Sequence, residues 1–145
     1  MTSSLLLSPV GRIRRRDFWI GFGFVMAASL VTNAIPVIGQ VLGLVILWPQ
    51  FVIHVKRLHD IGWTGWLLLL PVSVSLACAA LAIANGGAPI FAAPQQEAAK
   101  LLVSDQMHKP LLFLEIALAV QAAFLLWVGS TKGDAQANKF GPVPG

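Results

Sequence analysis

The sequence predicts an all-α membrane protein, with four transmembrane helices in a small helical bundle. Composition is the first observation: 57% of the 145 residues are hydrophobic and 11% are charged, and the mean hydropathy is +0.77. Soluble domains carry about a quarter charged residues, and a soluble chain of this size could not bury so much apolar surface. The other two observations are the long apolar runs and the uneven placement of basic residues.

A helix that crosses a bilayer needs roughly 20 apolar residues. Four segments qualify, and we expect spans at about 18–35, 38–55, 65–84 and 111–128. They form a single membrane domain over 1–145, with an outer loop at 85–110 and a cytoplasmic tail at 130–145. A short surface helix is expected within the loop, with one face made of Ala99, Leu102, Val103 and Met107.

The basic residues indicate the orientation. Of the ten Lys and Arg residues, only Lys100 and Lys109 lie on the predicted outer side, and the others are Arg12, Arg14, Arg15, Arg16, Lys56, Arg57, Lys132 and Lys139. Basic loops are retained in the cytoplasm, so both termini should be cytoplasmic. An N-terminal basic run before an apolar stretch also occurs in signal peptides, but three further spans follow, which favours an uncleaved first span.

Three motifs fall on the predicted cytoplasmic side. Residues 11–19 read GRIRRRDFW, residues 57–66 read RLHDIGWTGW, and residues 138–144 read NKFGPVP. This trio resembles the small bacterial inner-membrane proteins of the domain of unknown function 805 family, over nearly the whole chain. The resemblance implies a multi-pass protein of the bacterial inner (plasma) membrane. The family has no established activity, so no catalytic residue is implied. Val143 stands where family tails often have Asp.

The charged part of the middle motif is typical of a helix end. Lys56 and Arg57 end the second span, where cations suit the negative end of the helix dipole. Asp60 follows them at helical spacings of four and three residues and can pair with either. These structural roles leave only His59 unexplained.

The rest of the middle motif predicts a turn anchored at the membrane interface. Gly62 and Gly65 permit a tight reversal, and Thr64 can cap the third span. Trp63 and Trp66 suit the headgroup layer, where amphipathic aromatic rings concentrate.

The alternative to a purely structural role is a binding site on the inner face. A basic cluster can bind an anionic lipid headgroup or another phosphate. The candidate residues for a headgroup or partner site are Arg12, Arg14, Arg15, Arg16, Lys56, Arg57, His59, Asp60 and Asn138. We therefore predict a lipid- or partner-binding membrane component with a basic cytoplasmic face. The alternative function is an oligomeric small-solute or ion transporter, and a homo-oligomer or a membrane protein partner stays open.

Catalysis, cofactors and metals are not predicted. His59 and Asp60 lack a nucleophile at meaningful spacing, and neighbouring helical positions point about 100° apart. His108 lies on the other side of the membrane from His59, so a histidine metal site is not expected. No catalytic, cofactor-binding or metal-binding residue and no nucleic-acid partner is assigned.

Three polar residues fall within the predicted spans. Glu115 is an acid inside the fourth span, where a carboxylate is either structural or ion-coupling. His54 should bond a neighbouring helix or Arg57, and Gln121 should bridge helices, as Gln40 and Gln50 should.

Overall fold

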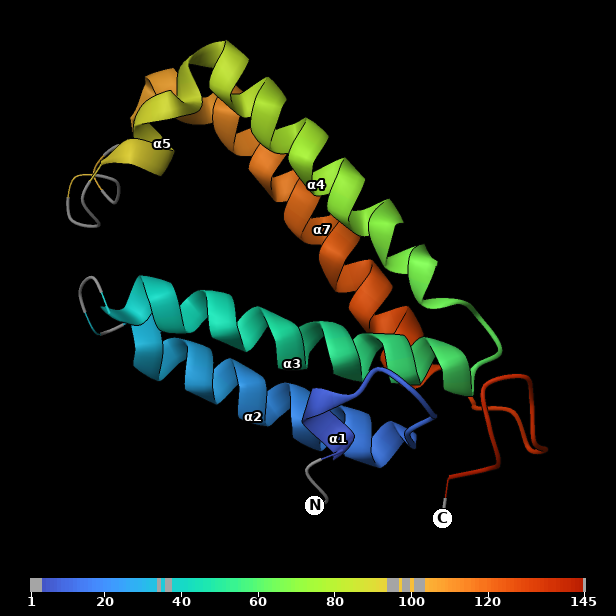
Figure 1. Ribbon diagram of the computed structural model, residues 1–145. Coiled ribbons are helices and arrows are strands. Elements are labelled where there is room, and N and C mark those ends of the chain that lie inside the picture. Colours follow the sequence, from blue (N-terminus) through green and yellow to red (C-terminus); the bar gives the residue numbers. More distant parts are fainter. Residues whose placement is uncertain are drawn as a thin grey trace. The chain divides into compact units, whose positions relative to one another are not determined.

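The computed structural model is all-helical (Figure 1). It describes residues 4–33, 35, 38–93, 97, 100 and 104–144, and this described part contains no strand. The predicted surface helix of the outer loop falls mostly outside the described residues. The helices are α1 Ser4–Leu7, α2 Arg15–Asn33, α3 Ile38–Asp60, η1 Gly65–Leu68, α4 Leu69–Ala82, η2 Ile83–Gly87, α5 Ala88–Ala92, η3 Asp105–Met107 and α7 His108–Ser130.

Contacts within the chain divide it into two compact units. The first combines Met1–Leu68 with Leu126–Gly145, and the second is Leu69–Leu125. The first unit therefore contains the described parts of all three sequence motifs. The prediction of one membrane domain stays a prediction.

In the first unit, α2 and α3 lie side by side as an antiparallel hairpin (Figure 1). Phe18 of α2 and Ile53 of α3 are fully buried. The ring of Phe18 stands edge-on to His54, with 5.2 Å between the ring centroids. His54 Nδ1 lies 2.7 Å from the carbonyl oxygen of Gln50, one turn earlier in α3. The polar contact of His54 is thus with its own helix, while its ring packs on α2.

Three helical segments are long and apolar enough to cross a membrane: Val41–Asp60, Gly65–Ala92 and Asp105–Ser130. They contain most or all of the second, third and fourth predicted spans, which indicates a membrane protein. Within the described residues, α2 is not among these segments, and it begins with the charged residues Arg15, Arg16 and Asp17. Large apolar side chains such as Leu30, Leu44 and Leu118 are exposed, as expected of helices whose solvent is lipid.

In the second unit, α4 and α7 lie side by side (Figure 1). Gln121 Nε2 of α7 donates to Ser75 Oγ of α4 at 3.0 Å and to the Pro71 carbonyl oxygen at 3.4 Å. Gly87 approaches the start of α7 so closely that an added Cβ would lie 2.8 Å from Pro110 Cβ. A polar bridge therefore joins α4 to α7, and Gly87 of η2 packs closely against the start of α7.

The other predicted intramembrane polar groups are placed differently. Glu115 is exposed on α7. The side-chain oxygen of Gln50 is buried, with no hydrogen-bond partner among the described residues, so this oxygen does not bridge helices. The side chain of Gln40 lies outside the described part.

The Gln121 bridge predicts a measurable loss of stability. Gln121→Leu and Ser75→Ala should each lower the free energy of unfolding by roughly 0.5–1.5 kcal/mol, the scale of interhelical hydrogen bonds in membranes. The double variant should lose little more than either single one, because both remove the same bond. Unfolding of the purified protein in detergent measures this. Ser73→Ala is the control, because Ser73 Oγ bonds Leu70 within α4. Additive losses for Gln121→Leu and Ser75→Ala would contradict the bridge.

Candidate functional site

The end of α3 places Asp60 at the centre of the first unit. The last turn closes with two backbone bonds: Trp63 N donates to the Leu58 carbonyl at 2.9 Å, and Gly62 N donates to the His59 carbonyl at 3.2 Å. This is a Schellman motif, which needs a left-handed residue just past the helix. Gly62 supplies it, with φ at +81°. The predicted turn glycine thus ends the helix directly after Asp60.

Two arginines hold the carboxylate of Asp60. Arg12 Nε donates to Oδ1 at 3.0 Å, and Arg12 Nη2 lies 3.0 Å from the same oxygen. Arg57 Nη1 donates to Oδ2. The exposed fractions of the Arg12, Arg57 and Asp60 side chains are 1%, 0% and 6%. The Arg57–Asp60 pair was expected from their spacing, whereas Arg12 comes from another motif. We call Arg12, Arg57 and Asp60 the Asp60 cluster.

Arg57 also binds the end of α7. Its Nε donates to the Val128 carbonyl at 3.1 Å, and its Nη2 donates to the Thr131 carbonyl. A third bond runs from Nη1 to the Ile13 carbonyl at 3.4 Å. The final carbonyls of a helix lack partners within the helix, so this side chain of α3 caps α7.

Arg12 binds the segment that follows α7. Its Nη1 donates to the Gln136 carbonyl at 2.8 Å, and its Nη2 donates to the Asp134 carbonyl at 2.7 Å. The backbone N–H of Asp134 in turn donates to the carbonyl of Asp60 at 2.8 Å. A Cβ added at Gly133 would collide with the Asp60 carboxylate. Glycine at 133 therefore lets this segment cross the cluster at close range.

His59 packs against the third motif. Its ring stacks on Phe140 with centroids 3.9 Å apart and planes inclined by 5°. Its Nδ1 lies 3.2 Å from the Gly11 carbonyl, and its own carbonyl accepts from Asn138 Nδ2 at 2.9 Å. Phe140 N donates to Asn138 Oδ1 at 3.0 Å. His59, which spacing alone left unexplained, thus has a structural place between the first and third motifs.

The predicted basic residues separate into buried and exposed groups. Arg12, Lys56 and Arg57 are buried, whereas Arg14, Arg15 and Arg16 are exposed. Arg14 Nε donates to the Pro144 carbonyl at 3.0 Å, and Arg15 Nη1 donates to the Ser130 carbonyl at 3.3 Å. Arg14 and Arg15 therefore bond the end of α7 and the C-terminal segment separately from the Asp60 cluster.

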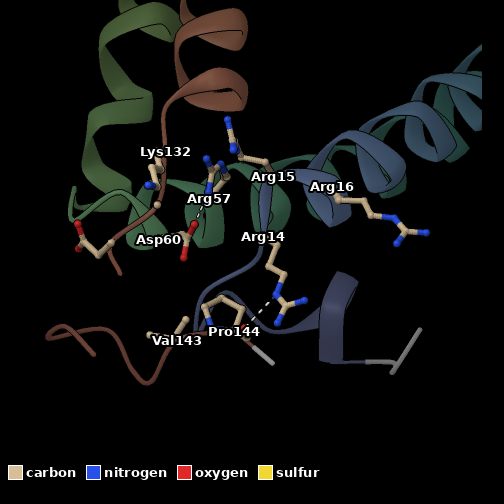
Figure 2. Close-up of a pocket in the computed structure, with 10 residues that line it drawn as sticks. Arg14, Arg15, Arg16, Arg57, Asp60, Lys132, Val143 and Pro144 are labelled. Carbon is tan, nitrogen blue, oxygen red and sulfur yellow. Dashed lines mark hydrogen bonds and ion pairs between the residues drawn. The ribbon is translucent and has the colours of Figure 1, made fainter. Parts of the chain in front are cut away.

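A hollow of about 350 Å³ opens beside the exposed arginines (Figure 2). We call it the basic hollow, and it is lined by Arg14, Arg15, Arg16, Arg57, Asp60, Lys132, Gly133, Asp134, Val143 and Pro144. All of these residues belong to the first unit. Lys132 was counted for orientation but was not predicted as a site residue. Its position shortly after the last predicted span is the sequence feature that could have indicated a role in the site.

The residues predicted to anchor the turn after α3 belong to the same unit. Trp63 and Trp66 are both exposed, and Trp63 stands edge-on to Trp127, with centroids 6.1 Å apart. A Cβ added at Gly65 would lie 3.0 Å from Val55, so the start of η1 lies close to α3. The Thr64 carbonyl accepts the first backbone bond of η1, from Leu67 N at 3.2 Å.

The geometry defines a helical protein with apolar helices of membrane-spanning length and a buried ionic cluster where three sequence motifs meet. The chain belongs to the family described as protein of unknown function (DUF805), whose model matches residues 6–142. The resemblance carried by the three motifs is thereby confirmed.

Similar proteins come from two *Escherichia coli* strains. "Uncharacterized protein YiiR" of strain K12 is 40% identical over 89 residues, which cover 56% of this chain and 61% of the relative. The protein of the same name in strain O157:H7 matches with the same values. The match thus spans less than two thirds of either relative. No solved structure matches the chain significantly.

The cluster geometry predicts that Asp60 stabilises the fold more than His59 does. Asp60→Ala leaves two buried guanidinium groups without their counter-ion, and breaking a buried pair in this way costs about 3–5 kcal/mol. His59→Ala removes only a stacked ring and one bond. Thermal unfolding and folded yield in detergent should therefore rank Asp60→Ala as much the less stable variant. Asp134→Ala, at an exposed acid in the same unit, is the matched control. Equal unfolding temperatures for Asp60→Ala and Asp134→Ala would contradict the prediction.

Proposed function

We propose that this protein is a four-span component of a bacterial inner membrane, with both termini in the cytoplasm, and that its exposed basic surface binds anionic lipid headgroups. The contacts of the Asp60 cluster support the number of spans, and the placement of basic residues supports the orientation. The exposed arginines and Lys132 support the binding.

The contact between Arg12 and Asp60 bears on whether α2 crosses the membrane. Arg12 precedes α2 and Asp60 ends α3, yet their side chains are bonded, so both lie on one side of the membrane. A chain that returns to the same side has crossed an even number of times. Since α3 is apolar enough to span, this contact supports a crossing by α2 as well. From Phe18 to Asn33 the helix extends about 24 Å, a little short of the roughly 30 Å of the hydrocarbon core, and its charged first residues would lie at the headgroups.

The same argument applies to the second half of the chain. Arg57 bonds the carbonyl of Thr131, which follows α7, so residues 61–131 also begin and end on one side. The two segments Gly65–Ala92 and Asp105–Ser130 supply two crossings. These contacts support the proposed four spans, with the three motifs on one face. Eight of the ten basic residues lie on that face, which the positive-inside rule assigns to the cytoplasm.

One observation carries the lipid-binding proposal: the fold buries only part of the set of basic residues. Arg12 and Arg57 are buried around Asp60, whereas Arg14, just before α2, and Arg15 and Arg16, at its start, are exposed. Basic residues beside an anionic leaflet gain about 1 kcal/mol each. The exposed arginines therefore have both the place and the charge to bind headgroups.

An oligomeric small-solute or ion transporter is the alternative, and Glu115 is the observation that favours it. This carboxylate is exposed on α7, inside a segment of membrane-spanning length. Carboxylates at such positions commonly face a partner helix or a water-filled path. The lipid proposal is preferred because several exposed cations share one hollow, whereas Glu115 is a single group.

Cysteine accessibility tests the topology. On a Cys78→Ala background, Val10→Cys and Ala135→Cys should be protected from a membrane-impermeant thiol reagent added outside intact cells. Glu97→Cys, in the predicted outer loop, should be labelled. All three positions are exposed, so protection reports the membrane side rather than burial. Labelling of Val10→Cys or Ala135→Cys from outside would contradict the proposed topology.

Lipid co-purification tests the binding. The protein recovered from nanodiscs with mixed lipids should be enriched in anionic over zwitterionic lipid. Replacing Arg14, Arg15 and Arg16 by Gln should reduce this enrichment about tenfold or more, since each residue contributes about 1 kcal/mol. Raising the salt concentration should weaken it too. Lys109→Gln, on the predicted outer side, is the control. Unchanged enrichment in the triple variant with preserved topology would refute the proposal.

A further inference from the structure

The basic hollow is built by three segments far apart in the sequence. Arg14 precedes α2, Arg15 and Arg16 begin it, Arg57 and Asp60 lie at the end of α3, and Lys132 comes from the segment after α7 (Figure 2). Val143 and Pro144 add an apolar wall. Among the residues that line the hollow, Asp60 and Asp134 carry negative charge, so cations outnumber carboxylates.

The charged groups deeper in the hollow already have partners within the protein. The Asp60 carboxylate accepts from Arg12 and Arg57, and the remaining bonds of Arg57 run to backbone carbonyls. Asp134 Oδ2 accepts from Asn138 Nδ2 at 2.7 Å. What faces a ligand is therefore a surplus of exposed cations against a single exposed carboxylate.

The exposed cations keep donors available for a ligand. Arg14 binds the Pro144 carbonyl through Nε, so within the described structure its two Nη groups stay available. Arg15 binds the Ser130 carbonyl through Nη1 alone. The ammonium group of Lys132 has three donors on a flexible stem. The hollow thus offers guanidinium groups from the first motif and a point charge from the segment after α7.

We infer that the basic hollow is a binding site for a phosphomonoester group, carried by a lipid headgroup or by a small soluble phosphate. A phosphomonoester bears a charge of about −1.5 to −2 at pH 7 and presents three acceptor oxygens. A phosphodiester bears one charge and has two such oxygens. Donors from separate segments and a surplus of positive charge complement the more highly charged group. The inference deepens the proposed lipid binding and rests on it, because it names the chemical group that the same basic surface selects.

Nanodiscs that differ only in their anionic lipid test the selectivity. One set contains phosphatidic acid, a phosphomonoester. The other contains phosphatidylglycerol, a phosphodiester, at twice the mole fraction so that the surface charge matches. Lipid retained by the purified protein is quantified by mass spectrometry. The wild type should retain phosphatidic acid about fivefold or more over phosphatidylglycerol.

Two variants and a matched control test whether the preference for phosphatidic acid arises in the basic hollow. Lys132→Gln and Arg14→Gln should each reduce the ratio of phosphatidic acid to phosphatidylglycerol about fivefold, the effect of about 1 kcal/mol per basic residue. Lys139→Gln removes an equal charge from a lysine that lies over the Phe140 ring and is not among the residues that line the hollow. It should keep the wild-type ratio. Equal effects of Lys132→Gln and Lys139→Gln would overturn the inference.

Soluble glycerol 3-phosphate distinguishes the two sources of the group. If it displaces phosphatidic acid, or binds the detergent-solubilised protein with loss in Lys132→Gln, a soluble phosphomonoester can occupy the hollow. If phosphatidic acid alone is selected, the ligand is a lipid headgroup. Either result supports the site. Equal retention of both anionic lipids together with no binding of glycerol 3-phosphate would refute it.

Failure of the inference is separable from failure of the proposed function. If anionic lipids stay enriched over zwitterionic lipid while phosphatidic acid and phosphatidylglycerol are retained equally and glycerol 3-phosphate does not bind, only the phosphomonoester site fails. If the enrichment itself is missing, the proposed lipid binding fails as well.

Discussion

A single carboxylate held by two arginines organises the first unit of this protein. Moving charges out of water costs several kcal/mol per ion, and the pairing compensates only when geometry and further hydrogen bonds are good. Here Asp60 receives both guanidinium groups, and the other donors of Arg57 bond the carbonyls of Val128 and Thr131. The excess positive charge is thus placed against the negative end of α7. One cluster supplies the counter-ion, the helix cap and the junction of three chain segments.

This arrangement assigns a physical meaning to the three motifs. Hydrogen bonds join Arg12 of the first motif to Asp60 of the second and to the carbonyl of Asp134. Asp134 in turn accepts a bond from Asn138 of the third motif, and His59 stacks on Phe140. The pattern that identifies the family is therefore, at these positions, a pattern of folding contacts. A function that depends on recognition of another molecule must use groups that these contacts leave exposed. Arg14, at the edge of the basic hollow, is such a group.

Local and tertiary contributions explain what the sequence could predict. Composition and the length of apolar runs predicted the helices, and three-residue spacing predicted the Arg57–Asp60 pair, because both depend on near neighbours along one helix. The partnership of Arg12 with Asp60 joins residues 48 positions apart and depends on how α2 folds back against α3. The stacking of His59 on Phe140 likewise needs the third motif to return to the second. No local pattern contains that information.

Counting charges predicts an orientation but does not separate the residues of the site. The positive-inside rule treats every basic residue alike, yet Arg12 and Arg14, two positions apart, differ completely in environment. Arg12 is held in a buried network, where salt screens charge interactions little, and its loss would act on folding. Arg14 is exposed, so its interactions with a ligand are screened by salt and its loss acts on binding. Neutralising the basic run as a block would mix these two effects. Experiments on these basic residues must therefore separate Arg12 from the three arginines that follow it.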